Sequence, residues 1–239
     1  MLFNVIQSMI QGQGFNAMSA FADVVASILI IIFILPFHEY AHGWAAKKLG
    51  DPTAENAGRL TFNPLASLDP FGALFLILFG FGWAKPVPID PRYFKNPKKD
   101  MALTAVAGPL ANLLASLASG ILFNVVLLVG GGSVTYGLYP ENSIVQFFLL
   151  FFGACTTINI SLAVFNLLPI PPLDGSRILG MFLSDRAMMA YYRYEKYIMF
   201  GIFALLLIGA LDVPLNFLQR VFTFGIMSLA NLPFRLLGV

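Results

Sequence analysis

Charged residues, histidine and cysteine are all scarce in this chain of 239 residues. Only 11% of its residues are charged and 58% are apolar, whereas soluble domains are about a quarter charged and about half apolar. Together with a mean hydropathy of +0.80, this excludes an ordinary soluble domain and predicts an integral membrane protein. The formal net charge is only +2 and Lys and Arg form no long block, so we expect no nucleic-acid partner.

The single cysteine, Cys155, excludes an internal disulfide and leaves the redox compartment open.

The only two histidines, His38 and His42, form the pattern H-E-x-x-H with Glu39 at the end of an apolar run over 24–37. On a helix, residues four apart share one face, so both imidazoles can reach one metal ion while Glu39 takes a proton from water. The alternative is a pair of structural histidines, but polar groups in an apolar segment need partners, and a metal ion would be one.

A catalytic zinc needs a third protein ligand, and without another histidine that ligand must be a carboxylate or Cys155. Cys155 lies near the middle of its apolar run, and Asp23 lies at the far end of the first helix. Asp69 remains open, but Asp174 follows a proline-rich stop that can hold it rigidly. We therefore favour Asp174, whose alternative role is a helix cap or an Asp-Gly turn.

The apolar runs predict an all-α polytopic integral membrane protein with about five to six transmembrane helices. The strongest spans cover about 21–47, 101–129, 143–168, 197–211 and 216–237. The apolar stretch 70–83 is shorter than the roughly 20 residues that a crossing needs, so we expect a re-entrant or partly buried segment. A short strand at Arg59-Leu60-Thr61-Phe62 would belong to a small β-hairpin.

We expect one membrane-embedded domain over 1–239, with a motif-bearing core over about 21–180 and a C-terminal helix pair over about 197–237. Basic residues cluster in 84–100 and in 177–196, while the loop 130–142 contains no Lys or Arg. The positive-inside rule therefore puts the two basic segments in the cytoplasm. The sequence thus predicts a multi-pass protein of the cell's inner membrane, with His38, His42 and Asp174 toward the cytoplasmic side.

Three separated motifs together resemble the site-2 proteases, a family of zinc-dependent intramembrane metalloproteases. They are His38-Glu39-x-x-His42, Gly108-Pro109-x-x-Asn112 and Asn166-Leu-Leu-Pro169-x-x-Pro172-Leu173-Asp174-Gly175. Two further stretches look like the compact prokaryotic branch without a PDZ domain: Gly58-Arg59-Leu60-Thr61-x-Asn63-Pro64 and Gly82-Trp83-Ala84-Lys85-Pro86-Val87-Pro88. The similarity covers roughly residues 33–180.

The resemblance implies one Zn²⁺ per chain, bound by His38, His42 and Asp174, with Glu39 as the acid and base. It also implies that Asn166 stabilises the reacting carbonyl, although an asparagine at this position could instead link two helices. Asn112 allows the same two interpretations.

The implied activity is endopeptidase cleavage of transmembrane segments of membrane proteins within the lipid bilayer. A helical substrate must unwind first, and the strand predicted at 59–62 could hold the unwound segment by backbone pairing. The alternative function is a zinc-binding membrane scaffold or transporter that hydrolyses nothing. Against a transporter, the spans after His42 are almost bare of the ionisable residues that mark an ion path. The sequence does not indicate an oligomeric state.

Overall fold

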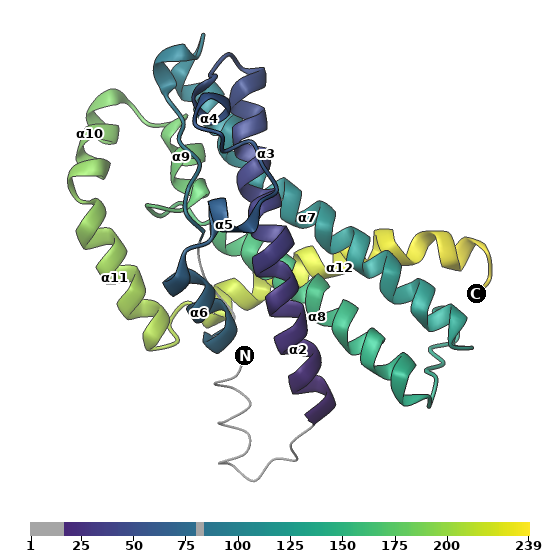
Figure 1. The fold of residues 1–239 in the computed structure, drawn as a ribbon. Coiled ribbons are helices and arrows are strands. Elements are labelled where there is room, and N and C mark those ends of the chain that lie inside the picture. Colours follow the sequence, from purple (N-terminus) through teal and green to yellow (C-terminus); the bar gives the residue numbers. More distant parts are fainter. Residues whose placement is uncertain (1–16, 80–83) are drawn as a thin grey trace.

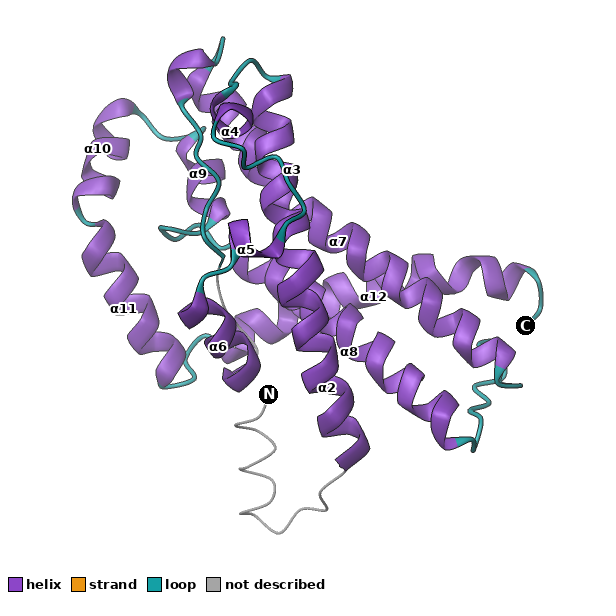
Figure 2. Cartoon of the chain, viewed as in Figure 1, coloured by secondary structure: helices purple, strands orange, loops and turns teal. Residues whose placement is uncertain are grey.

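The computed structural model describes residues 17–79 and 84–239, and helices joined by loops make up its regular structure (Figure 1 and Figure 2). Within these residues there is no strand, and the one β-bridge joins Ser133 to Leu138. The β-hairpin that the sequence predicted is therefore not confirmed.

Residues 59–62 form a loop that two side chains help to hold in place, together with the backbone bond from Arg59 N–H to Ala54 O at 2.8 Å. The guanidinium Nη2 of Arg59 donates to the carbonyl oxygen of Lys85 at 2.7 Å. The ring of Phe62 stacks on Tyr40, with 4.5 Å between the ring centroids. This loop therefore packs against the helix that carries the H-E-x-x-H motif.

The first long helix is continuous from Ala17 to Lys48 but changes its winding in the middle. It consists of α2 (Ala17–Leu29), a π-helical turn η1 (Ile30–Ile34) and α3 (Leu35–Lys48). Pro36 is the second residue of α3, two positions after the wide turn ends. Proline lacks a backbone donor and crowds the preceding turn, and a π turn relieves that crowding. The turn immediately precedes His38 and Glu39 in α3.

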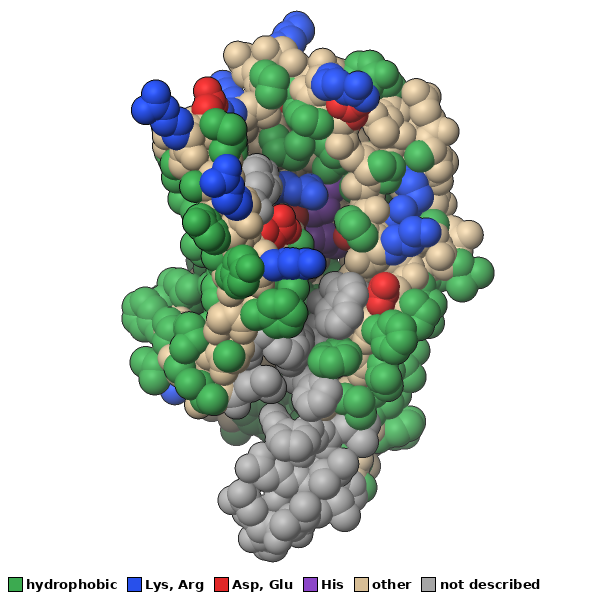
Figure 3. Space-filling view, turned by 90° about the vertical axis from the view of Figure 1, so that its left-hand side faces the viewer, with side chains coloured by type: hydrophobic (Ala, Val, Ile, Leu, Met, Phe, Trp, Pro, Cys, Tyr) green, Lys and Arg blue, Asp and Glu red, His purple; other side chains and the backbone are tan. Residues whose placement is uncertain are grey.

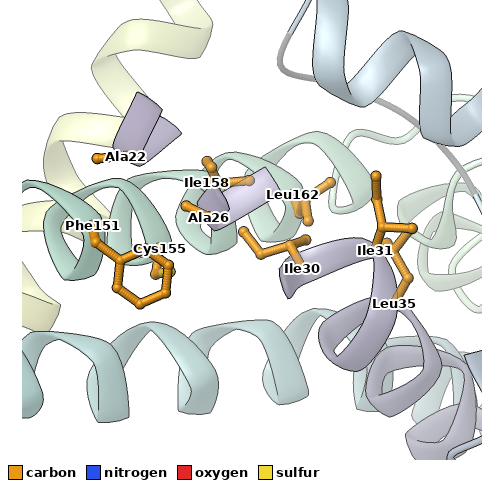
Figure 4. Packing of buried hydrophobic residues seen from close by; sticks show 9 residues of the cluster. All are labelled: Ala22, Ala26, Ile30, Ile31, Leu35, Phe151, Cys155, Ile158 and Leu162. Carbon is orange, nitrogen blue, oxygen red and sulfur yellow. The ribbon is translucent and has the colours of Figure 1, made fainter. Parts of the chain in front are cut away.

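Two antiparallel helices, α7 (Pro97–Val129) and α8 (Ser143–Asn166), form the centre of the molecule. Helix α2 packs on α8, and α3 packs on α7. Figure 4 shows the apolar core between the first helix and α8, where Cys155 is buried beside Ala22, Ala26 and Ile158. Cys155 thus packs in the core, away from the histidines.

Three helices in the described residues are long and apolar enough to cross a membrane: Ala17–Lys48, Pro97–Val129 and Ser143–Asn166. The five to six spans predicted from the sequence are not confirmed. Helices α6 (Pro70–Phe79) and α11 (Glu195–Leu207) have only 10 and 13 residues. The last helix, α12 (Asp212–Leu236), has 25 residues but interleaves polar and charged side chains among its apolar ones.

The boundaries of α12 differ from the prediction because Asp212-Val213-Pro214 does not separate two helices. These residues form its first turn, where a proline removes no hydrogen bond that the helix needs. The remaining helices are short: α4 (Thr53–Asn56), α5 (Pro64–Ser67), the 3₁₀ turn η2 (Pro91–Tyr93), α9 (Asp174–Gly180) and α10 (Asp185–Arg193).

Candidate metal centre

The structure brings His38, His42 and Asp174 together, although 132 positions of sequence separate His42 from Asp174. The two histidines lie one turn apart on α3, and their Nε2 atoms are 3.0 Å from each other. Each Nε2 is 3.3 Å from Oδ2 of Asp174, the first residue of α9. In the described part of the chain, these are the only His, Cys, Asp or Glu side chains grouped closely enough to hold a metal ion.

The spacing and protonation of these atoms fit a single metal ion. Two ligand atoms of a tetrahedral zinc site, each about 2.0 to 2.1 Å from the ion, are about 3.3 Å apart. A carbonyl oxygen can only accept a hydrogen bond, so the 2.8 Å contact from Nδ1 of His42 to Thr104 O puts the proton on Nδ1. In the neutral ring, Nε2 of His42 is then unprotonated, and its lone pair faces the other two ligands.

The third ligand atom also lacks a proton donor. Oδ2 of Asp174 is buried and accepts no hydrogen bond from the described residues. Lone pairs and a carboxylate charge that converge in a buried site are costly without a compensating group. A cation would supply that compensation, so the donor set suits a metal.

Gly108 on α7 makes room for the two imidazoles. A Cβ atom at this position would lie 2.6 Å from Cε1 of His38 and closer still to Nε2 of His42. Only glycine lets α7 approach α3 so closely without displacing the rings. This contact gives a physical reason for the glycine of the Gly108-Pro109 motif.

Gly175 has a similar role behind Asp174. A Cβ atom there would overlap the carbonyl oxygens of Leu167 and Leu168 at the end of α8. Because α9 begins directly against these carbonyls, its first residue is directed at the histidines of α3. Close backbone packing thus requires the glycine of the Asp-Gly pair, whereas the aspartate supplies the carboxylate.

Glu39 is buried next to the cluster, and a backbone group holds its carboxylate. The N–H of Val87 donates to Oε2 of Glu39 at 2.8 Å. The extended segment around Val87 is tied down at both ends. Its Lys85 N–H bonds to Ser67 O at 2.9 Å, and its Asp90 N–H bonds to Oδ2 of the fully buried Asp51 at 2.8 Å.

The side chain of Asp90 itself points to another partner. It accepts from Nε of Arg92, with both oxygens at 2.9 Å. These hydrogen bonds from the guanidinium lower the pKa of Asp90 below its ordinary value. The backbone N–H of Asp90 therefore anchors the segment beside Glu39 to Asp51, whereas the side chain of Asp90 does not.

A cavity of about 550 Å³ opens onto the cluster. Its lining is mostly apolar and comes from α3, the segment 84–88, the end of α8, the 170–173 turn and α11. Asn166 lines it as well, and its Nδ2 donates to Leu162 O of its own helix at 3.0 Å. Figure 3 shows histidine side chains at the bottom of a hollow, with charged side chains beside them.

Sequence reasoning missed the groups that orient these side chains. The carbonyl of Thr104 and the N–H of Val87 belong to the backbone, so no residue type marks them. The buried carboxylate of Asp51 stands in a turn-rich stretch where an aspartate is unremarkable. A signal did exist in Pro86-Val87-Pro88, because Val87 carries the only backbone N–H among these three residues; Gly82 and Trp83 of the same motif lie outside the described residues.

These features define a class: an apolar helical protein in which an H-E-x-x-H helix and an aspartate form a candidate metal centre at a mostly apolar cavity. The chain belongs to peptidase family M50, which confirms the predicted relationship to the site-2 proteases. The model of that family matches residues 131–209, which include Asp174. The chain is 41% identical over 153 residues to YwhC of Bacillus subtilis, a match that covers 63% of this chain and 67% of YwhC.

Two further relatives are less similar in sequence. Rip2 of Mycolicibacterium smegmatis is 27% identical over 194 residues, which cover 77% of this chain and 69% of Rip2. MJ0611 of Methanocaldococcus jannaschii is 28% identical over 173 residues, which cover 67% of this chain and 76% of MJ0611. All three relatives are named as candidate zinc metalloproteases. No solved structure matches the chain.

Proposed function

We propose that this protein is a zinc-dependent intramembrane endopeptidase that cleaves transmembrane segments of membrane proteins. One observation carries the proposal: two imidazoles and a carboxylate meet at 3.0 to 3.3 Å beside the buried carboxylate of Glu39, at a cavity in an apolar helical protein. Membership in family M50 and the metalloprotease names of its relatives support the same activity.

We propose His38, His42 and Asp174 as the ligands of one zinc ion per chain. The ion would polarise the scissile carbonyl and increase the acidity of the attacking water. Glu39 accepts the proton of that water and delivers it to the leaving amine. The hydrogen bond from Val87 keeps the Glu39 carboxylate in one orientation for both transfers.

Asn166 is proposed to donate a hydrogen bond to the developing oxyanion. Its amide has two N–H groups, of which the bond to Leu162 O uses one. That bond also fixes the side chain along α8 at the wall of the cavity. Contacts of this kind contribute about 3 kcal/mol to transition-state stabilisation.

The substrate is proposed to be an apolar segment that enters from the bilayer. Leu35, Val87 and Phe200 are among the apolar side chains that line the cavity. The outer surfaces of the central helices are apolar too, with Leu114 of α7 61% exposed and Phe148 of α8 43% exposed. Such a surface suits contact with lipid.

We further propose one membrane-embedded domain in the inner membrane, with the metal centre toward the cytoplasm. On the face in Figure 3, Lys and Arg side chains gather in the half that contains the histidines, and the described side chains of the other half are mainly hydrophobic. This distribution agrees with the positive-inside rule. A transporter or scaffold is not favoured, because neither function uses a carboxylate aligned beside the metal ligands.

The test is cleavage of a single-span model substrate by the purified protein in detergent. Activity should disappear on treatment with a zinc chelator and return when zinc is added back. A parent protein that binds zinc and cleaves none of several such substrates would contradict the proposal.

A further inference from the structure

Asn112 lies at the buried contact between α7 and α3, and its only hydrogen bond to the described residues reaches a proposed metal ligand. Its Oδ1 atom is 3.3 Å from Nδ1 of His38. The side chain of Asn112 is completely buried, and His38 is buried as well. Its Nδ2 atom has no hydrogen-bond partner within the described residues.

The contacts of α7 with the two histidines repeat every four residues. Thr104, Gly108 and Asn112 are spaced four apart on α7, as His38 and His42 are on α3. Thr104 supplies a carbonyl to Nδ1 of His42, Gly108 leaves room for both rings, and Asn112 supplies an oxygen to Nδ1 of His38. One face of α7 therefore contacts both imidazoles, with Thr104 and Asn112 at the two Nδ1 atoms, which lie on the side away from Asp174.

A neutral imidazole carries one proton, and its position decides which nitrogen can bind a metal. The backbone carbonyl of Thr104 fixes the proton of His42 on Nδ1. For His38 the corresponding acceptor among the described residues is the side chain of Asn112, which a substitution can remove. Groups that accept from the outer nitrogen of a metal-binding histidine raise metal affinity about 10- to 100-fold.

We infer that Asn112 is a positioning residue of the metal centre. Its Oδ1 accepts the Nδ1 proton of His38 and holds the ring in the tautomer whose Nε2 faces His42 and Asp174. This inference rests on the proposed zinc site, and it assigns to Asn112 a task other than oxyanion stabilisation or simple helix linkage.

The experiment compares Asn112→Leu with a matched change on the same helix. Asn124 is also buried, but its Nδ2 bonds to Ala230 O and Asn231 Oδ1 of α12, far from the histidines in sequence. Zinc affinity is measured in detergent by competition with a chelator. We expect Asn112→Leu to weaken zinc binding about 10- to 100-fold, and Asn124→Leu to change it by less than about twofold.

Asn112→Asp is the rescue variant, because a carboxylate keeps the acceptor in the same place. We expect its zinc affinity to equal or exceed that of the parent. The inference is overturned if Asn112→Leu keeps parental affinity, if Asn124→Leu loses as much, or if Asn112→Asp is as weak as the leucine variant. A parent that binds no zinc would instead overturn the proposed function, so the two failures are distinguishable.

Discussion

The backbone N–H of Val87 donates a hydrogen bond to Oε2 of Glu39 at 2.8 Å. Prolines on both sides fix the backbone of this segment and provide no N–H of their own. The carboxylate of Glu39 is thus oriented by a stiff segment from a different part of the chain. Catalytic groups that are held in place before the substrate arrives avoid the cost of ordering during the reaction.

Asp51 should influence catalysis without touching the metal. Its carboxylate anchors the segment beside Glu39 through Asp90 N–H. Asp51→Ala leaves this partly buried donor unpaired and also removes the acceptor of Thr53 N–H and Oγ1. The expected cost is about 1 to 3 kcal/mol in stability, and the segment is freed. We expect a lower kcat with unchanged zinc content, measured by cleavage assay and metal analysis on the same preparation.

The control for this variant is Asp90→Ala, which removes the exposed pair with Arg92 but keeps the backbone N–H. It should cleave at nearly the parental rate. Equal losses in the two variants would show that the anchoring bond of Asp51 has no special role.

Gly108→Ala should empty the metal centre. The added methyl group would collide with both imidazoles, so the rings cannot keep their positions while α7 stays packed on α3. We expect zinc per chain to fall from about one toward zero while the helical content stays constant. Gly153→Ala on α8 is the control, because a Cβ there meets only Phe123 at 3.9 Å; parental zinc content in Gly108→Ala would contradict the account.

The grouping of His38, His42 and Asp174 could be predicted from the sequence because each is a distinctive residue in a fixed pattern. His38 and His42 are the only histidines, and the charges of the loops predicted that Asp174 lies on the same side of the membrane. The strand predicted at 59–62 was not confirmed, because the side chains of Arg59 and Phe62 help to hold this segment as a loop, which no local pattern indicates. The backbone groups of Thr104 and Val87 became visible only when helices and segments distant in sequence were packed together.

The helices were predicted best where apolar residues run without interruption, as in α7 and α8. The C-terminal region was harder, because a proline such as Pro214 breaks a helix in its interior but is tolerated in its first turn. The sequence around Asp212 and Pro214 therefore predicted a break between two helices, whereas these residues form the first turn of α12.

Asn166 should affect the rate more than metal binding. If its amide stabilises the oxyanion, Asn166→Ala lowers kcat by about 10² to 10³ and leaves zinc affinity unchanged. Steady-state cleavage at several substrate concentrations separates kcat from KM. A variant that cleaves normally would mean that Asn166 only links to Leu162 within α8.

The orientation in the membrane can be tested with single cysteines, since the chain has only Cys155 and that residue is buried. In a Cys155→Ser background, Lys95→Cys and Tyr136→Cys place a thiol at exposed positions in two different loops. A membrane-impermeant maleimide on intact cells should label Tyr136→Cys, and it should label Lys95→Cys only after permeabilisation. The reverse pattern would put the metal centre on the outer side.

The most direct test of the central claim compares the parent with Glu39→Gln for both zinc content and cleavage of a single-span substrate. The amide is nearly the same size as the carboxylate but cannot accept the proton of the attacking water. We expect both proteins to hold about one zinc per chain, and Glu39→Gln to cleave at least about 100-fold more slowly. If Glu39→Gln cleaves at the parental rate with its zinc bound, Glu39 is not the acid and base and the proposed mechanism is wrong.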